Sequence, residues 1–82
     1  MLDFEFVNKI INLKDKKCRL IKCKNNHAIV EIYVNSVVPK YSLKFYTTHN
    51  ARSFLMNIHC FNYEEIKLEE DKKSLKYQKL FI

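Results

Sequence analysis

Apolar residues near the start of the chain recur at the three- and four-residue spacing of a helix. They are Phe6, Val7, Ile10 and Ile11. This spacing predicts a short amphipathic helix over residues 3–13, with Asp3 as its N-cap.

The next segment changes to the two-residue alternation of strands. Residues 18–23 are rich in residues that favour strands, and apolar and polar positions then alternate from Ala28 to Val34. Asn25-Asn26 lies between the two runs, and asparagine tolerates the positive φ of a tight turn. The pattern predicts a β-hairpin.

A third strand and a second helix follow a connector at residues 35–40. Alternation from Tyr41 to Tyr46 predicts the strand, and Thr47 or Thr48 is placed to cap a helix. The apolar stripe of that helix is formed by Ala51, Phe54, Leu55 and Ile58. Residues 61–68 are expected to form a fourth extended segment.

These elements predict a small α-β-β-β-α domain of the α+β class, with an antiparallel sheet and both helices packed on one face. At 82 residues the chain is expected to form one domain, residues 1–82, without a separate catalytic module. Residues 69–82 are first charged and then apolar. The apolar tail is expected to dock on a partner and is formed by Leu75, Tyr77, Leu80, Phe81 and Ile82.

Composition argues against several classes of function. The chain has no glycine, which phosphate-binding loops, dinucleotide fingerprints and nucleophile elbows require. We therefore expect no enzyme, no cofactor and no small-molecule substrate. No apolar run approaches the ~20 residues of a membrane span, so we expect no membrane partner.

The three cysteines are an odd number without paired spacing, which indicates free thiols in the reducing cytoplasm. Cys18, Cys23, His27 and the His59-Cys60 pair are nominal zinc ligands. Cys18 and Cys23 lie five apart in an extended segment, so their side chains are expected on opposite faces. We expect no metal site.

The net charge of +6 is concentrated between Lys9 and Lys24, where seven basic residues face one acid, Asp15. Such one-sided clustering is typical of a surface that follows a phosphate backbone. The candidate RNA-binding residues are Lys14, Lys16, Lys17, Arg19, Lys22 and Lys24, with Lys9, Lys40 and Lys44 as weaker candidates. Tyr33 and Tyr46 are candidates for stacking on bases.

The order of elements resembles the family of the eukaryotic large-subunit ribosomal protein numbered thirty-eight. Residues 4–68 can be laid along that family with about two extra residues near Val37-Val38. Like residues fall at Phe6, Lys14-Asp15, Lys17, Ile21-Lys22, Leu43, Ala51 and Glu65. The chain departs from the family at residues 35–40, where the family has an aromatic and basic segment, and in residues 69–82, which go beyond its usual end.

The resemblance implies a structural component of the large ribosomal subunit that binds structured rRNA and adjoins neighbouring ribosomal proteins. The chain is also similar to the small Alu-RNA-binding proteins of the signal recognition particle, at residues 44–47. An alternative from another class is a small protein-interaction module, for instance a virus-encoded inhibitor, anchored by Tyr33, Tyr46 and residues 77–82.

Overall fold

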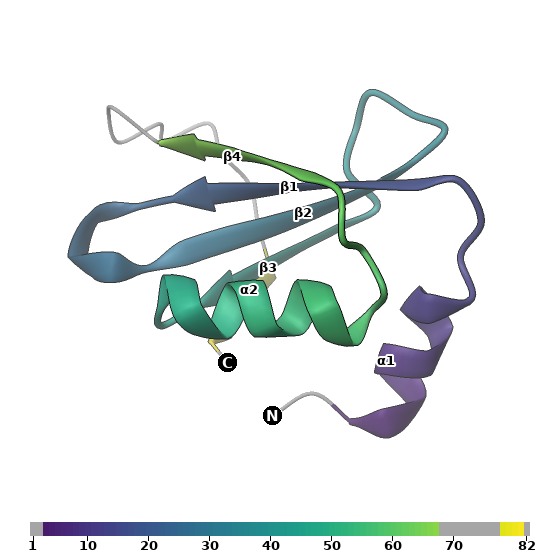
Figure 1. Cartoon of the computed structure of the whole chain (residues 1–82), viewed down its shortest axis with the longest axis horizontal. Helices are drawn as coiled ribbons and strands as arrows, with labels where there is room; N and C mark the ends of the chain where they lie inside the picture. Colours follow the sequence, from purple (N-terminus) through teal and green to yellow (C-terminus); the bar gives the residue numbers. More distant parts are fainter. Residues whose placement is uncertain (1–2, 68–77, 82) are drawn as a thin grey trace.

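The computed structural model describes residues 3–67 and 78–81 and shows an α+β domain. Two helices lie on one side of a five-stranded sheet (Figure 1). In chain order the elements are α1 (Phe4–Ile11), β1 (Lys16–Lys22), the 3-10 turn η1 (Lys24–Asn26), β2 (Ala28–Val34), β3 (Tyr41–Phe45), α2 (Thr48–Asn57), β4 (Tyr63–Lys67) and β5 (Gln78–Phe81). The predicted fold class is confirmed.

Both helices begin at side-chain caps, as predicted. The Asp3 carboxylate accepts a hydrogen bond from the Phe6 amide at 2.8 Å, and the Thr47 hydroxyl accepts one from the Asn50 amide at 3.0 Å. Each bond satisfies an amide that has no partner within the first helical turn. Thr47, rather than Thr48, is therefore the cap of α2.

The central three strands form the predicted antiparallel meander. Cys18 lies opposite Ile32 across β1 and β2, and Ala28 lies opposite Phe45 across β2 and β3. The outer strands differ from the expectation, because β4 pairs with β1 and β5 pairs with β3 in the parallel direction. The sheet is therefore mixed, with the order β4-β1-β2-β3-β5.

The apolar tail was expected to dock on a partner, but the structure incorporates part of it into the sheet. The backbone of Gln78–Phe81 forms edge strand β5 beside β3. Residues 69–77 and Ile82 lie outside the described residues. The backbone of residues 78–81 is thus engaged within the domain.

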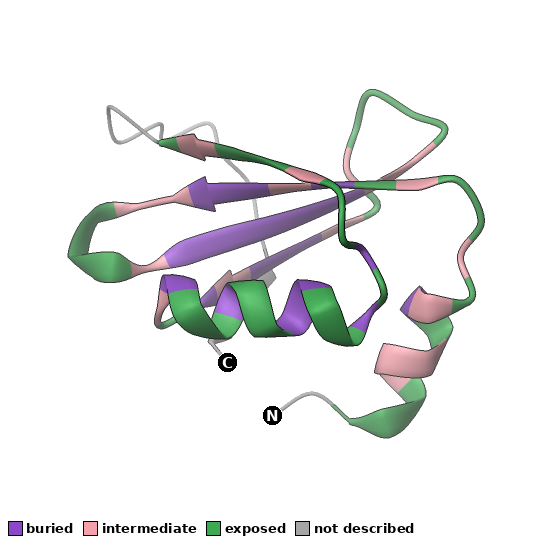
Figure 2. Cartoon of the chain, in the orientation of Figure 1, coloured by how far each residue is buried: buried purple, intermediate pink, exposed green. Residues whose placement is uncertain are grey.

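The hydrophobic core lies between the two helices and one face of the sheet, which we call the helix face. Leu20, Val30 and Leu43 from the sheet are fully buried there, together with Ile10 of α1 and Leu55 of α2. Figure 2 shows buried residues along β1 to β3 and along the side of α2 that faces the sheet. The predicted apolar stripe of α2 is confirmed.

The opposite face of the sheet, which we call the second face, also contains buried positions. Ile21 and Ile29 lie opposite each other on β1 and β2 and are 4% and 2% exposed. Glu31 and Ser42 are neighbours across β2 and β3 and are buried as well. The middle of the second face is therefore not an accessible platform.

The chain makes its turns without glycine. Positive φ occurs at Asp15, Asn25, Asn26, Asn35 and His59 among the described residues. Asparagine and aspartate tolerate this left-handed region better than other residues with a side chain. The predicted Asn25-Asn26 turn is confirmed.

Candidate nucleic-acid interface

Alternation along β1 divides the predicted basic residues between the two faces of the sheet. Lys17 and Arg19 share the second face with Tyr33, their neighbour on β2, whereas Lys16 and Lys22 belong to the helix face. The basic run therefore does not form one continuous surface.

Exposed lysines lie at one end of the strands. We call it the loop end: β1, β3 and β4 begin there, β2 ends there, and α1 lies beside it (Figure 1). Lys9 in the last turn of α1, Lys14 in the following loop and Lys17 are all exposed. Within residues 3–67 and 78–81 no acid forms an ion pair with any of the three.

Lys40 also lies at the loop end, directly before β3. Its amide donates to the Ile32 carbonyl at 2.7 Å, and its ammonium lies 5.8 Å from the centre of the Tyr41 ring. The Tyr41 ring packs edge-on against Phe6 at 5.3 Å between ring centres. This aromatic contact fixes α1 beside the lysines.

The structure gives Lys16 a different environment. Its ammonium donates to the carbonyl oxygens of Ile11 at 3.2 Å and Leu13 at 3.5 Å. The Ile11 carbonyl belongs to the last turn of α1, where carbonyls lack helical partners. Lys16 thus satisfies the C-terminal end of the helix.

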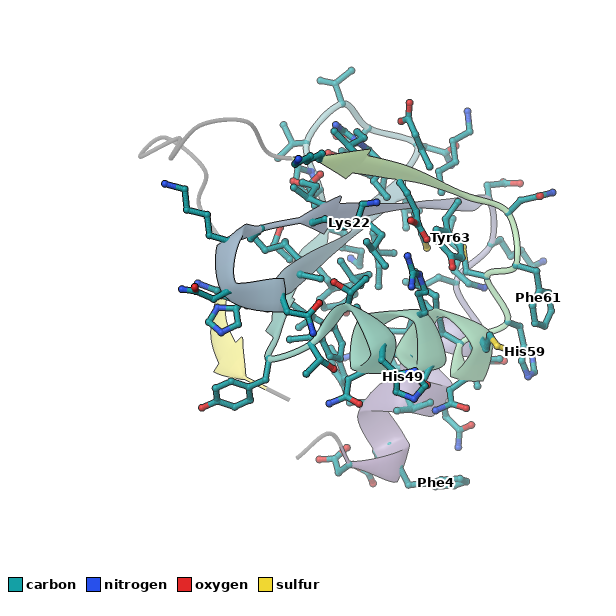
Figure 3. The ribbon with its side chains drawn as sticks, turned by 60° about the vertical axis from the view of Figure 1, so that its left-hand side comes forward. Phe4, Lys22, His49, His59, Phe61 and Tyr63 are labelled. Carbon is teal, nitrogen blue, oxygen red and sulfur yellow. The ribbon has the colours of Figure 1, made fainter. Side chains whose placement is uncertain are left out.

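The remaining predicted lysines lie away from the loop end. Lys22 ends β1 and forms an ion pair with Glu65 at 3.7 Å, and Lys24 is exposed in η1. Figure 3 shows Lys22 well apart from Phe61, which lies in the loop before β4. Lys44 is half-buried and lies opposite Ile29 on the second face.

Arg19 is held by a polar network on the second face. Its Nη1 donates to the Tyr33 hydroxyl oxygen at 3.2 Å, and that hydroxyl donates to the Glu31 carboxylate at 2.9 Å. Arg19 also forms ion pairs at 3.7 Å with Glu31 and with Glu64. Its Nε is shielded from solvent and makes no hydrogen bond to any described residue.

The network changes the chemistry of Tyr33. Burial raises the pKa of the Tyr33 hydroxyl, and Glu31 adds to the rise, while Arg19 opposes it. The hydroxyl therefore stays protonated and acts as a hydrogen-bond donor to Glu31. Because two carboxylates surround the guanidinium of Arg19, this residue adds little net positive charge to the surface.

An open groove of about 910 Å³ lies at the loop end, and residues of both faces, Lys16 and Cys18 among them, line it. Lys17 and Arg19 of β1, Tyr33 of β2, Val37 of the 35–40 connector, and Tyr63 and Glu64 of β4 contribute to its walls. The groove thus combines a lysine that has no acidic partner among the described residues, a guanidinium held in a polar network, and aromatic rings.

A pair of exposed aromatic side chains beside this groove was not predicted from the sequence. His59 and Phe61 lie in the loop between α2 and β4 with nearly parallel rings, 6.2 Å between centres and 16° between planes (Figure 3). Phe61 is 68% exposed. The positive φ of His59 turns the chain at this point, and no periodicity in the sequence signals it.

The two tyrosines predicted to stack on bases do not share a platform. Tyr33 lies at the loop end within the Arg19 network. Tyr46 follows β3 at the other end of the sheet and packs edge-on against His27 at 6.1 Å. Only Tyr33 adjoins the groove.

The cysteines also separate in the fold. Cys18 and Cys60 meet within the hydrophobic core, where burial first and then Cys60 raise the pKa of the Cys18 thiol well above its usual range. Cys23 follows β1, and its thiol donates weakly to the Ile21 carbonyl. The described part of the chain contains no group of three His, Cys, Asp or Glu residues that could hold a metal ion.

Comparison of the chain with models of protein families, with curated proteins and with solved structures found no match. Neither of the helices in the described ranges is long and apolar enough to cross a membrane.

Proposed function

We propose that this chain is a structural RNA-binding component of a cytoplasmic ribonucleoprotein. The sequence resemblance favours the large ribosomal subunit as the particle and rRNA as the partner. The observation that carries the proposal is the set of exposed lysines at the loop end, Lys9, Lys14 and Lys17, beside exposed aromatic rings. Lysines neutralise phosphates and release counterions, while rings stack on bases.

The ion pairs of the described residues support a narrower contact set than the sequence predicts. Arg19 and Lys22 are paired with glutamates, and Lys16 binds helix carbonyls. Lys14 and Lys17 carry charge that no acid of the described residues neutralises. We assign them the main phosphate contacts, with Lys9 and Lys40 beside them.

The experiment is a titration of a fluorescent RNA hairpin with the whole chain between about 50 and 200 mM KCl. Each phosphate contact contributes roughly 0.7–0.9 to the slope of log affinity against log salt. The double variant Lys14→Ala/Lys17→Ala is expected to reduce the slope by about 1.4–1.8, without changing thermal stability. The matched control is Lys24→Ala/Lys67→Ala, which removes the same charge at the opposite end of the sheet.

Equal losses of slope in the two double variants would show that binding follows net charge and not the loop end. A wild-type affinity that is independent of salt would contradict RNA binding through phosphates altogether. The particle is tested by sedimentation of the tagged chain from a native lysate. We expect the chain to co-migrate with large ribosomal subunits at about 0.5 M salt. Isolated electrostatic contacts weaken strongly at this salt concentration, so co-migration there distinguishes a component of the particle from a loosely bound protein.

A further inference from the structure

The groove at the loop end is lined by aromatic and aliphatic side chains as well as charged ones, and phosphate binding alone does not require them. Arg19, Tyr33, Val37 and Tyr63, the first residue of β4, all line the groove. Val37 is 95% exposed. The groove is thus open to a flat group that enters from solvent.

Arg19 is oriented before any ligand arrives. The N–H groups of a guanidinium lie in its plane; the Nη1 of Arg19 donates to the Tyr33 hydroxyl, while Glu31 and Glu64 lie 3.7 Å from its Nη1 and its Nε. Its side chain is nevertheless 40% exposed. A guanidinium also has a flat face, which stacks well on aromatic systems and is not used by these in-plane contacts.

The cations around the groove differ in whether an acidic side chain neutralises them. Glu31 and Glu64 offset the charge of Arg19, whereas Lys17 on the same face and Lys14 in the adjacent loop have no acidic partner among the described residues. A ligand that fits both features has a flat aromatic group flanked by negative charges. An unpaired nucleotide in a strand of RNA has this chemistry.

We infer that the groove binds an unpaired nucleobase, stacked on the Arg19 guanidinium, with neighbouring phosphates on Lys14 and Lys17. This inference rests on the proposed RNA-binding function and specifies its substrate as single-stranded rather than duplex RNA. Unpaired bases expose their faces for stacking on arginine planes and aromatic rings, whereas paired bases within a helix do not.

The first test compares a 12-nucleotide single-stranded RNA, carrying 2-aminopurine at its centre, with a 12-base-pair RNA duplex. We expect tighter binding of the single strand and quenching of 2-aminopurine fluorescence, because stacking quenches this base. Val37→Asp places a negative charge at the groove and is expected to weaken single-strand binding about fivefold or more. Val38→Asp is the matched control, since Val38 is 65% exposed and does not line the groove, and its effect should stay below about twofold.

The second variant, Arg19→Lys, keeps the positive charge and removes the planar group. We expect loss of the quenching and about fivefold weaker binding of the single strand, with duplex affinity unchanged. Thermal unfolding of the variant is measured alongside. If Arg19→Lys fails to fold, the comparison of the two valine variants still decides, because both valines are exposed.

Equal binding of single strand and duplex, without quenching, would overturn the base site. If Lys14→Ala/Lys17→Ala still lowered the salt slope in that case, the proposed RNA-binding function would stand. Equal effects of Val37→Asp and Val38→Asp would likewise exclude the groove. Absence of salt-dependent binding to both RNAs would instead refute the proposed function itself.

Discussion

Substitution of Lys16 distinguishes a structural role of this lysine from an RNA-binding role. The sequence places it among the phosphate-binding candidates, whereas the structure directs its ammonium to the Ile11 and Leu13 carbonyls. Replacement by methionine removes the ammonium and keeps most of the alkyl stem. We expect Lys16→Met to destabilise the fold and to leave RNA binding unchanged.

The magnitude follows from the geometry. The bond to Ile11 is 3.2 Å long and half-buried, and the bond to Leu13, at 3.5 Å, is marginal. A hydrogen bond to a charged group contributes roughly 1.5–3 kcal/mol when buried, and a cation at a helix C-terminus about 0.3–1 kcal/mol. With one good bond that is partly exposed to water, we expect a loss of about 1–1.5 kcal/mol.

The assay is thermal unfolding together with the salt titration of RNA binding. A loss of about 1–1.5 kcal/mol corresponds to a fall in Tm of roughly 5–10 °C for a domain of this size. Lys14→Met is the control, because Lys14 is exposed in the same loop, and it should lower the salt slope by about 0.7–0.9 without changing Tm. An unchanged Tm with a reduced salt slope for Lys16→Met would refute the assignment.

Two further predictions concern stability and thiol chemistry. Arg52 donates to both carboxylate oxygens of Glu65, at 2.9 and 3.1 Å, and this contact holds the pKa of Glu65 below its usual value of 4.5. Because the pKa of Glu65 is lower in the folded state, its ionised carboxylate stabilises the fold above pH 4.5, and this stabilisation is lost as pH falls through the folded-state pKa. The Tm difference between wild type and Glu65→Gln should therefore shrink from pH 6 to pH 3. A difference that stays constant over this range would contradict the prediction. In thiol labelling with a disulfide reagent at pH 8, we expect Cys23 to react first and the buried Cys18 and Cys60 to react only after unfolding. Equal labelling rates of the three thiols in the native state would contradict the burial of Cys18 and Cys60.

Local patterns were sufficient to predict the helices and the meander. Asp3 and Thr47 cap the helices through their own side chains, and the Asn25-Asn26 turn sets the pairing of β1 with β2. The partners of β4 and β5 depend instead on which sheet edges the meander leaves open. The alternation of apolar and polar residues in the last third of the chain does not predict which strand β4 or β5 pairs with.

The candidate site was predicted only in part, because charge neutralisation is a tertiary property. The sequence identifies Arg19 as a cation, but its acidic neighbours Glu31 and Glu64 reach it through strand pairing. The hairpin register does contain one usable signal, since a turn at residues 24–27 places Arg19 directly opposite Glu31. The approach of β4, and with it Glu64 and the ring of Phe61, has no such local signal.

The burial of the second face limits how RNA could lie on this domain. A strand of RNA spread across the whole sheet would need its central positions to be accessible, but Ile21 and Ile29 are buried there and Glu31 is buried beside them. The exposed lysines that adjoin the groove lie at the loop end, so the site that we propose there holds a single base with its flanking phosphates. Because one stacked base and a few phosphate contacts give modest affinity, our proposal includes neighbouring components of the particle that hold the chain in place.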